Sequence, residues 1–168
     1  MKHSLVVMGV SGCGKSSLGA LLADRLGARF VEGDAHHSLT NRAKMSQGIA
    51  LTDADREGWL HVLAEELQQR PLPIVLTCSA LKRSYRERLR AASSGLRFVF
   101  MDIGYEAARQ RVAARGASHF FSTSLVDNQF ATLERPDGEA GVLRVDAEAP
   151  LDRLQAEVSA WLTEQEHA

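Results

Sequence analysis

The sequence predicts an α/β fold built on a five-stranded parallel sheet. Five short apolar runs, at 4–8, 29–33, 73–78, 97–102 and 141–146, recur along the chain. Segments with helical periodicity separate these runs, and parallel strands require such crossover connections. With 168 residues and 45% hydrophobic composition, the chain can bury one core. We therefore expect a single domain, 1–168, with helices on both faces of the sheet.

The helices follow from apolar residues spaced three or four positions apart. The first is expected at 15–26 and ends at Gly27, because glycine is favoured just after a helix. The second is expected at 54–69, with Asp53 or Thr52 as N-cap and Pro71 as its stop. The last opens at Pro150, and the tail "TEQEHA" is expected to be frayed or solvent-facing. The stretch 115–136 is the least periodic, which fits either a mobile flap or a packed irregular connection.

Charge and composition exclude several classes of partner. The net charge of −1 and the pI of about 6.6 provide no field that would attract nucleic acid or an anionic membrane. The apolar runs are too short to span a bilayer, so we expect a cytoplasmic protein without nucleic-acid or membrane partners. Cys13 and Cys78 match no metal-ligand or disulfide spacing, and we expect them to be buried or incidental thiols.

A phosphate-binding loop follows the first apolar run. The residues "GVSGCGKS" fit the pattern G-x-x-x-x-G-K-[ST] between an expected strand and an expected helix. Glycines let backbone N–H groups converge on phosphate oxygens, Lys15 bridges the β- and γ-phosphates, and the Ser16 hydroxyl ligates Mg²⁺. The nucleotide-binding residues are expected to be Gly9, Val10, Ser11, Gly12, Cys13, Gly14, Lys15, Ser16 and Ser17.

The loop leaves the acceptor of the phosphoryl group open. A dinucleotide-binding fingerprint fails because position 17 is not glycine. A GTPase switch lacks the guanine-reading N-K-x-D motif, and a motor ATPase needs an acidic residue that "PIVLTCSA" does not supply. Asp102 closes the next expected strand and is a weak alternative for the carboxylate that binds the metal. A small-molecule kinase is favoured, and a non-catalytic nucleotide-binding module is the alternative from another class.

Asp34 is the candidate for orienting the acceptor hydroxyl. It follows the second expected strand, at the sheet edge where ligands collect in such folds. The alternative is a turn aspartate that caps the helix starting near His36. His36 and His37 lack the partners of a metal site, although one of them could contact the acceptor.

Several longer blocks resemble the P-loop gluconokinases, which are related to shikimate and nucleoside monophosphate kinases. They are "MGVSGCGKSS", "EGDAHH", "NRAKMSQGIALTDADREGWL", "CSALKRSYRERLR", "HFF" and "NQFATLERP", in this order. The resemblance covers about 6–146. It implies a three-layer P-loop kinase fold with a mobile lid, roughly 115–136, and a homodimer. It also implies that ATP with Mg²⁺ phosphorylates D-gluconate to 6-phospho-D-gluconate, a step that feeds the pentose phosphate or Entner-Doudoroff pathway. Another acceptor, such as shikimate or a nucleotide, stays open.

The resemblance also implies roles for particular positions. Lys15, Asp34, Arg111 and Arg115 would be catalytic, the two arginines coming from the stretch that supplies lid cations. The acceptor-binding residues would be Asp34, His37, Lys82, Tyr85, Arg86, His119, Phe120 and Gln129. The segment 146–150 would contact adenine. Two departures from the family pattern are Gly58 in "DADREGWL" and Ser118 in "SHFF"; the second shifts the arginine assignment by one or two positions.

Overall fold

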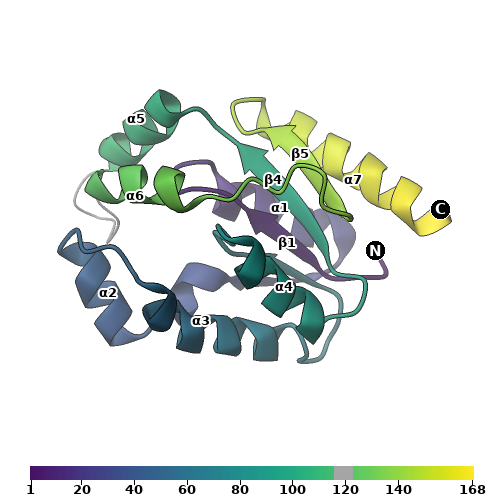
Figure 1. Ribbon diagram of the computed structural model, residues 1–168. Coiled ribbons are helices and arrows are strands. Elements are labelled where there is room, and N and C mark those ends of the chain that lie inside the picture. The colour runs from purple at the N-terminus through teal and green to yellow at the C-terminus, as the bar shows by residue number, and fades with distance from the viewer. Residues whose placement is uncertain (116–122) are drawn as a thin grey trace.

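A five-stranded parallel sheet forms the middle layer of the computed structural model, which describes residues 1–115 and 123–168 (Figure 1). Its strands are β1 (Leu5–Met8), β2 (Arg29–Glu32), β3 (Ile74–Thr77), β4 (Arg97–Asp102) and β5 (Val142–Asp146). Their order is β2-β3-β1-β4-β5, and each neighbouring pair is parallel. The expected strands are thus confirmed, because each matches an apolar run of the sequence.

Helices cover both faces of this sheet. Helices α1 (Lys15–Leu26) and α7 (Leu151–His167) pack on one face, and α3 (Asp53–Glu66) and α4 (Arg83–Ala92) pack on the other (Figure 1). Side chains of β1 alternate between the two cores, so that Leu5 and Val7 face α1 while Val6 and Met8 face α3. A strand buried on both faces has no polar side, which explains its continuous apolar run.

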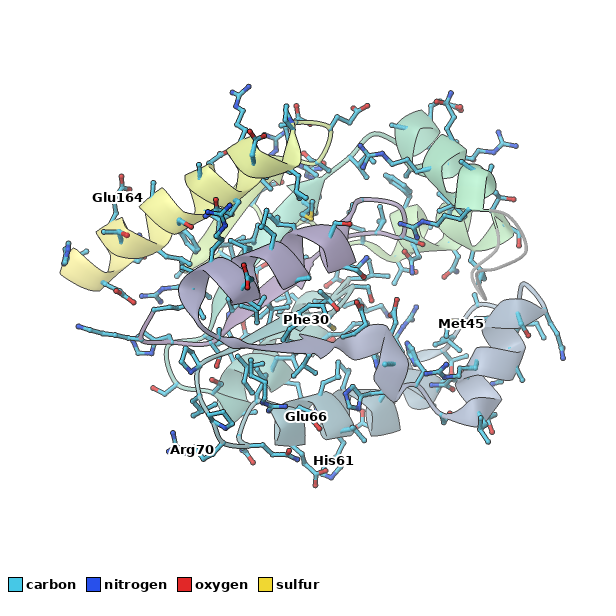
Figure 2. All side chains as sticks on the ribbon, turned by 180° about the vertical axis from the view of Figure 1, so that it is seen from behind. Phe30, Met45, His61, Glu66, Arg70 and Glu164 are labelled. Atoms are coloured by element: carbon cyan, nitrogen blue, oxygen red, sulfur yellow. The ribbon has the colours of Figure 1, made fainter. Side chains whose placement is uncertain are left out.

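The remaining helices gather around the carboxyl ends of the strands. They are α2 (Leu39–Ser46), α5 (Tyr105–Arg115) and α6 (Ser124–Thr132) (Figure 1). A 3₁₀ turn, Gly33–His36, joins β2 to α2. Viewed from behind, Met45 on α2 and Glu164 on α7 lie at opposite ends of the molecule (Figure 2). The ligand-binding edge of the sheet therefore lies far from the end of α7.

One expected helix boundary was wrong. Helix α3 is capped by Thr52, as one of the alternatives predicted, but it ends at Glu66, well before Pro71. The side chain of Leu67 is buried there, whereas the next three residues are exposed, so the chain leaves the helix before proline acts. The tail is not frayed but helical through His167, and it faces solvent, as the other alternative predicted, with Thr163, Glu164, His167 and Ala168 exposed. Glu166 accepts a hydrogen bond from the Lys2 N–H, which holds the helix end against the N-terminal segment.

Within residues 1–115 and 123–168, no helix has the length and apolar character needed to cross a membrane.

Candidate active site

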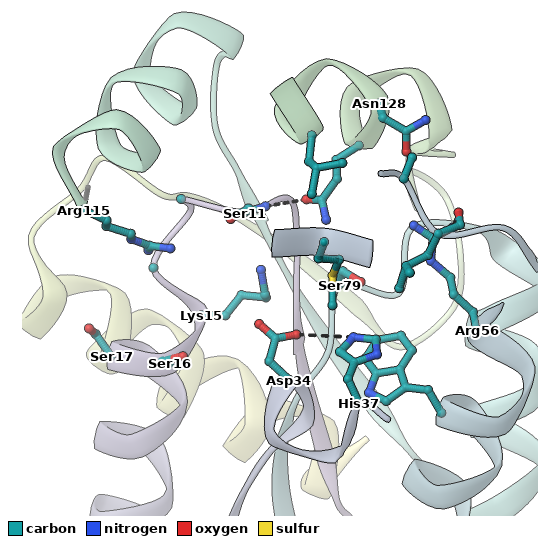
Figure 3. Close-up of a pocket in the computed structure, with 18 residues that line it drawn as sticks. Ser11, Lys15, Ser16, Ser17, Asp34, His37, Arg56, Ser79, Arg115 and Asn128 are labelled. Atoms are coloured by element: carbon teal, nitrogen blue, oxygen red, sulfur yellow. Dashed lines mark hydrogen bonds and ion pairs between the residues drawn. The ribbon is translucent and has the colours of Figure 1, made fainter. Parts of the chain in front are cut away.

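A single pocket joins the phosphate-binding loop to the end of β2. Its lining comes from the loop, the turn after β2, α2, α3 and α6 (Figure 3). The members are Ser11, Gly12, Gly14, Lys15, Ser16, Ser17, Asp34, His37, Met45, Ala50, Leu51, Arg56, Trp59, Ser79, Arg115, Leu125, Asn128 and Gln129. Strands β1, β2 and β3 end side by side, and so these distant segments meet at one edge of the sheet.

The phosphate-binding loop has the conformation that its glycines predict. Gly12 has φ +87°, and a Cβ there would lie 2.8 Å from the Ala108 carbonyl oxygen, so glycine lets α5 approach the loop closely. The Lys15 ammonium donates hydrogen bonds to the carbonyl oxygens of Gly9 and Val10, at 2.9 and 3.1 Å. The loop precedes α1, whose N-terminus contributes partial positive charge. This combination suits the phosphates of a nucleotide.

Both cysteines are buried, as expected. Burial also raises the pKa of Cys78 to about 12, which keeps its thiol protonated. Cys78 therefore lacks the properties of a reactive thiol.

Asp34 reaches the pocket because the chain turns sharply after β2. The Gly33 N–H donates to the Thr77 hydroxyl at 3.1 Å, and that hydroxyl donates to Glu32 at 2.6 Å. A Cβ at Gly33 would lie 2.0 Å from the Thr77 carbonyl oxygen, so only glycine allows this crossing over β3. Helix α2 is capped by Ser38, which makes the expected alternative of Asp34 as a helix cap wrong. The half-exposed Asp34 carboxylate lines the pocket instead.

His37 is buried beside Asp34. Its ring stacks on Trp59, with centroids 4.2 Å apart and an interplanar angle of 16°. The Trp59 indole N–H donates to the Gly33 carbonyl oxygen at 2.8 Å, which ties the stack to the turn that carries Asp34. Burial, together with the charges of Arg56 and Arg42, lowers the pKa of His37 to about 4. The imidazole is therefore neutral near pH 7.

Arg56 places a buried guanidinium on the opposite wall of the pocket. Its Nη1 donates to the Leu51 carbonyl oxygen at 2.9 Å and to the Tyr85 hydroxyl at 3.4 Å. No carboxylate of the described residues lies within ion-pair distance of it, and its side chain is only 7% exposed. A buried cation without a carboxylate partner is costly, so this wall favours an anionic group on a ligand.

The two candidate arginines of α5 occupy different places. Arg115 lines the pocket near Lys15 and Ser16 (Figure 3). Arg111 lies against the loop backbone: its Nη1 donates to Gly12 and Cys13 oxygens at 3.2 and 3.4 Å. Its Nη2 donates to the Ala147 oxygen at 3.4 Å, which brings the expected adenine-contacting segment beside the loop.

Helix α6 contributes amide side chains to the pocket. Gln129 is buried there, and its Oε1 accepts a hydrogen bond from the Ser11 N–H at 2.6 Å. Its neighbour Asn128 also lines the pocket. Two other candidates in the expected lid, His119 and Phe120, lie outside the described residues.

Tyr85 lies one contact away from the pocket lining, and Lys82 lies one contact further away. The Tyr85 hydroxyl and the Lys82 ammonium both donate to the Asp53 carboxylate, and these bonds lower the pKa of Asp53. Tyr85 reaches the pocket through its contact with Arg56. We therefore expect Tyr85 to orient Arg56, and Lys82 to hold Asp53 beside Tyr85, instead of binding the acceptor directly.

Arg86 is placed differently from the expectation. Its side chain is fully buried, and it donates to both carboxylate oxygens of Glu139, with Nη2 2.6 Å from Oε2. The same guanidinium donates to the carbonyl oxygens of Ala80, Leu81 and Glu134. Each of its three guanidinium nitrogens donates a hydrogen bond within the protein. The expectation that Arg86 contacts the acceptor is therefore wrong, and its role is structural.

Asp102, the weak alternative for a metal carboxylate, is neutralised by two arginines. Arg135 donates to it at 2.9 and 3.1 Å and Arg144 at 2.7 Å, and these bonds lower its pKa. Among the described residues no cluster of three His, Cys, Asp or Glu could hold a metal by itself. The pocket does offer one hard oxygen donor of the predicted kind, the Ser16 hydroxyl, which suits Mg²⁺ bound together with phosphates.

Sequence reasoning missed Arg56, Trp59 and Asn128. One signal could have found Arg56: it lies at the start of the apolar stripe of α3, whose other members are Trp59, Leu60 and Leu63. An arginine in a buried stripe requires a partner, and that partner is either a distant carboxylate or a ligand.

Comparisons with known proteins agree with this architecture. A family model described as an AAA domain matches residues 5–136. A gluconokinase from Gluconobacter oxydans is 45% identical over 157 residues, which cover 92% of this chain and 88% of that protein. The crystal structure of a gluconokinase from Sinorhizobium meliloti is 44% identical and has a TM-score of 0.85, over 98% of this chain and 97% of that one. Shikimate kinase from Aquifex aeolicus, 16% identical with a TM-score of 0.62 over 98% of this chain and 99% of that one, shares the fold.

Proposed function

The chain belongs to the gluconokinase family, and we propose that it transfers the γ-phosphoryl group of ATP to D-gluconate, giving ADP and 6-phospho-D-gluconate. The observation that carries the proposal is the order of groups along one pocket. The phosphate-binding loop lies at one end, Arg56 lies at the other, and Asp34 and His37 lie between them (Figure 3). D-Gluconate has its carboxylate and its terminal hydroxyl at opposite ends of a six-carbon chain, which matches this order.

The loop end of the pocket would hold the nucleotide. The loop residues 9–17 and the N-terminus of α1 would face the phosphates, and Arg111 supports the loop beside the expected adenine segment. Lys15 and Arg115 supply positive charge near the transferred group. Ser16 would hold Mg²⁺, which supplies further neutralisation of phosphate charge when bound.

Asp34 would orient the acceptor. As the terminal hydroxyl oxygen bonds to the γ-phosphorus, the bond from that phosphorus to the β–γ bridging oxygen breaks and ADP leaves. The Asp34 carboxylate accepts the hydroxyl proton in the same step. The Arg56 guanidinium would hold the carboxylate of gluconate, so that the far end of the substrate fixes the position of the reacting end.

The test is an ADP-release assay coupled to a spectrophotometric readout, run with gluconate, shikimate and nucleoside monophosphates. We expect turnover with gluconate and little with the others. Faster turnover with shikimate or a nucleotide would show that this compound, and not gluconate, is the acceptor. Tight ATP binding with no turnover for any acceptor would favour a non-catalytic nucleotide-binding module.

The Asp34→Asn variant separates the two halves of the site. We expect a large loss of kcat with gluconate and a Kd for ATP close to that of the unaltered protein, because the carboxylate faces the acceptor. Unchanged gluconate kinetics would remove Asp34 from the mechanism.

The homodimer stays a prediction from resemblance, and light scattering after size-exclusion chromatography tests it.

A further inference from the structure

A buried polar relay runs behind Asp34, from α3 through α2 to His37. The Asn41 side chain is only 4% exposed, and its Nδ2 donates to the Asp55 carbonyl oxygen at 2.9 Å. The same Nδ2 lies 3.4 Å from Nδ1 of His37. On the other edge of the ring, Nε2 of His37 lies 3.9 Å from Oδ1 of Asp34 (Figure 3). Asn41 is thus linked to the acceptor-orienting carboxylate through the imidazole.

The partners of Asn41 determine which nitrogen of His37 carries the proton. A backbone carbonyl can only accept a hydrogen bond, so the amide atom facing Asp55 must be the NH₂ group. That NH₂ group also faces Nδ1 of His37, which must therefore accept. Because the ring is neutral, its single proton lies on Nε2. The N–H bond then faces Asp34.

The other states of His37 would not serve the carboxylate equally well. With the proton on Nδ1, a lone pair at Nε2 would face the negative charge of Asp34. A protonated ring would pair with Asp34 and weaken it as a proton acceptor. The neutral ring with Nε2–H directs a donor toward the carboxylate 3.9 Å away, and toward a hydroxyl or water oxygen that binds beside the two groups, without neutralising Asp34.

We propose that Asn41 is a positioning residue for phosphoryl transfer, which acts by fixing His37 as the Nε2–H tautomer that faces Asp34 and the acceptor hydroxyl. The role in transfer rests on the proposed function, whereas the control of the tautomer by Asn41 does not.

The tautomer is measured directly by ¹⁵N NMR of histidine-labelled protein. His37 is identified among the six histidines by comparison with the His37→Gln variant. In the unaltered protein we expect a protonated, pyrrole-type Nε2 and an unprotonated, pyridine-type Nδ1. In Asn41→Asp, a carboxylate oxygen replaces the NH₂ group, so the proton should move to Nδ1 or the ring should gain a second proton. Asn41→Ala, which loses both partners, should show a mixture of tautomers and serves if Asn41→Asp does not fold.

Kinetics then test the positioning role. We expect Asn41→Asp to lower kcat with gluconate roughly 10- to 100-fold, as loss of an orienting partner does in other sites, with the KM for ATP within about twofold. The matched control is Ser38→Ala. It removes the cap that accepts from the Asn41 backbone N–H, and so weakens α2 without touching the amide. Ser38→Ala should keep the Nε2–H tautomer and the kcat.

Three results would overturn the proposal. A proton on Nδ1 in the unaltered protein, or an unchanged tautomer in both Asn41 variants, would refute the relay. A changed tautomer with unchanged kcat would refute the positioning role while the proposed function stands. Failure of the unaltered protein to phosphorylate gluconate would overturn the proposed function and the role of Asn41 in it, and the spectra would still decide whether Asn41 controls His37.

Discussion

Arg56 is the side chain that best explains why this pocket would accept an acid. It is buried, it has no carboxylate partner among the described residues, and it lies across the pocket from the phosphate-binding loop. The two cations expected among the acceptor-binding residues, Lys82 and Arg86, are paired with Asp53 and Glu139. Of these three cations, Arg56 is therefore the one whose charge the carboxylate of a ligand can neutralise.

Replacing Arg56 should remove discrimination between a charged and an uncharged acceptor. We expect Arg56→Gln to lower kcat/KM for D-gluconate roughly 100-fold, because the substrate carboxylate loses its buried partner. D-Glucitol has the same chain length and a terminal hydroxyl but no carboxylate, and its slower turnover should change little. Initial-rate kinetics with both compounds check this. An equal loss for both would mean that Arg56 supports the pocket without reading the carboxylate.

His37 should make stability depend on pH. Its pKa is about 4 in the folded chain and about 6.5 when unfolded, since burial and then Arg56 and Arg42 disfavour the charged ring. Between these values the unfolded chain binds more protons, so stability falls as pH falls from 6.5 toward 4. From pH 7.5 to 5 the loss should be roughly 2 kcal/mol.

Urea unfolding at the two pH values measures this loss. His37→Gln should lack it, whereas His61→Gln, on the exposed face of α3, should keep it. A pH dependence that is the same in the unaltered protein and in His37→Gln would show that other groups cause it.

At the scale of elements, α3 delivers the acceptor side of the pocket, because it carries both Arg56 and Trp59. Its start is fixed by a capping box in which the Thr52 side chain accepts from the Asp55 N–H and Asp55 accepts from the Thr52 N–H. Lys44 of α2 binds the same Asp55 carboxylate at 2.8 Å. The cap therefore joins two helices that line the site.

Loss of this cap should cost modest stability. We expect Thr52→Ala to lower the free energy of unfolding by about 1 kcal/mol, which corresponds to about 2–4 °C in Tm. Thr163→Ala is the control, since this exposed hydroxyl donates only to Ser159 within α7. Differential scanning calorimetry of both variants tests the assignment, and equal shifts would argue against a capping role.

The positions of the strands and of α1 could be predicted from the sequence, because each depends on local periodicity and on glycine and proline. The end of α3 could not. Pro71 predicted the end of the helix, but the helix ends earlier, at Glu66, where buried Leu67 is followed by exposed residues. Helix ends depend on what the next segment packs against, which a single window of sequence does not contain.

At the scale of the whole molecule, Arg86 links segments far apart in the chain. It joins α4 to the loop after β3 through Ala80 and Leu81, and to the segment before β5 through Glu134 and Glu139. Both partners of the ion pair are buried, at 0% and 7% side-chain exposure. Removing one charge leaves the other buried and unpaired.

Arg86→Met should therefore destabilise the fold without changing recognition of the acceptor. We expect a loss of about 3–5 kcal/mol, partly recovered in Arg86→Met/Glu139→Leu, and a KM for gluconate within about twofold in the folded fraction. Arg88→Met on the same helix breaks an exposed pair with Glu57 and should cost less than about 1 kcal/mol. Urea titration and initial rates measure both effects. A large rise in KM with normal stability would restore Arg86 to the acceptor site.

The sequence by itself determined the phosphate-binding loop, the five strands and the position of Asp34, because each of these is written in contiguous residues. It predicted Arg86 as an acceptor-binding residue and gave Arg56 no role, although both are buried on their helices. Only the tertiary structure decided between them. Glu139 arrives from a distant segment to pair with Arg86, whereas Arg56 has no carboxylate partner among the described residues and faces the pocket. A buried charge is satisfied by whatever the fold brings to it, and that partner is not encoded near it in the chain.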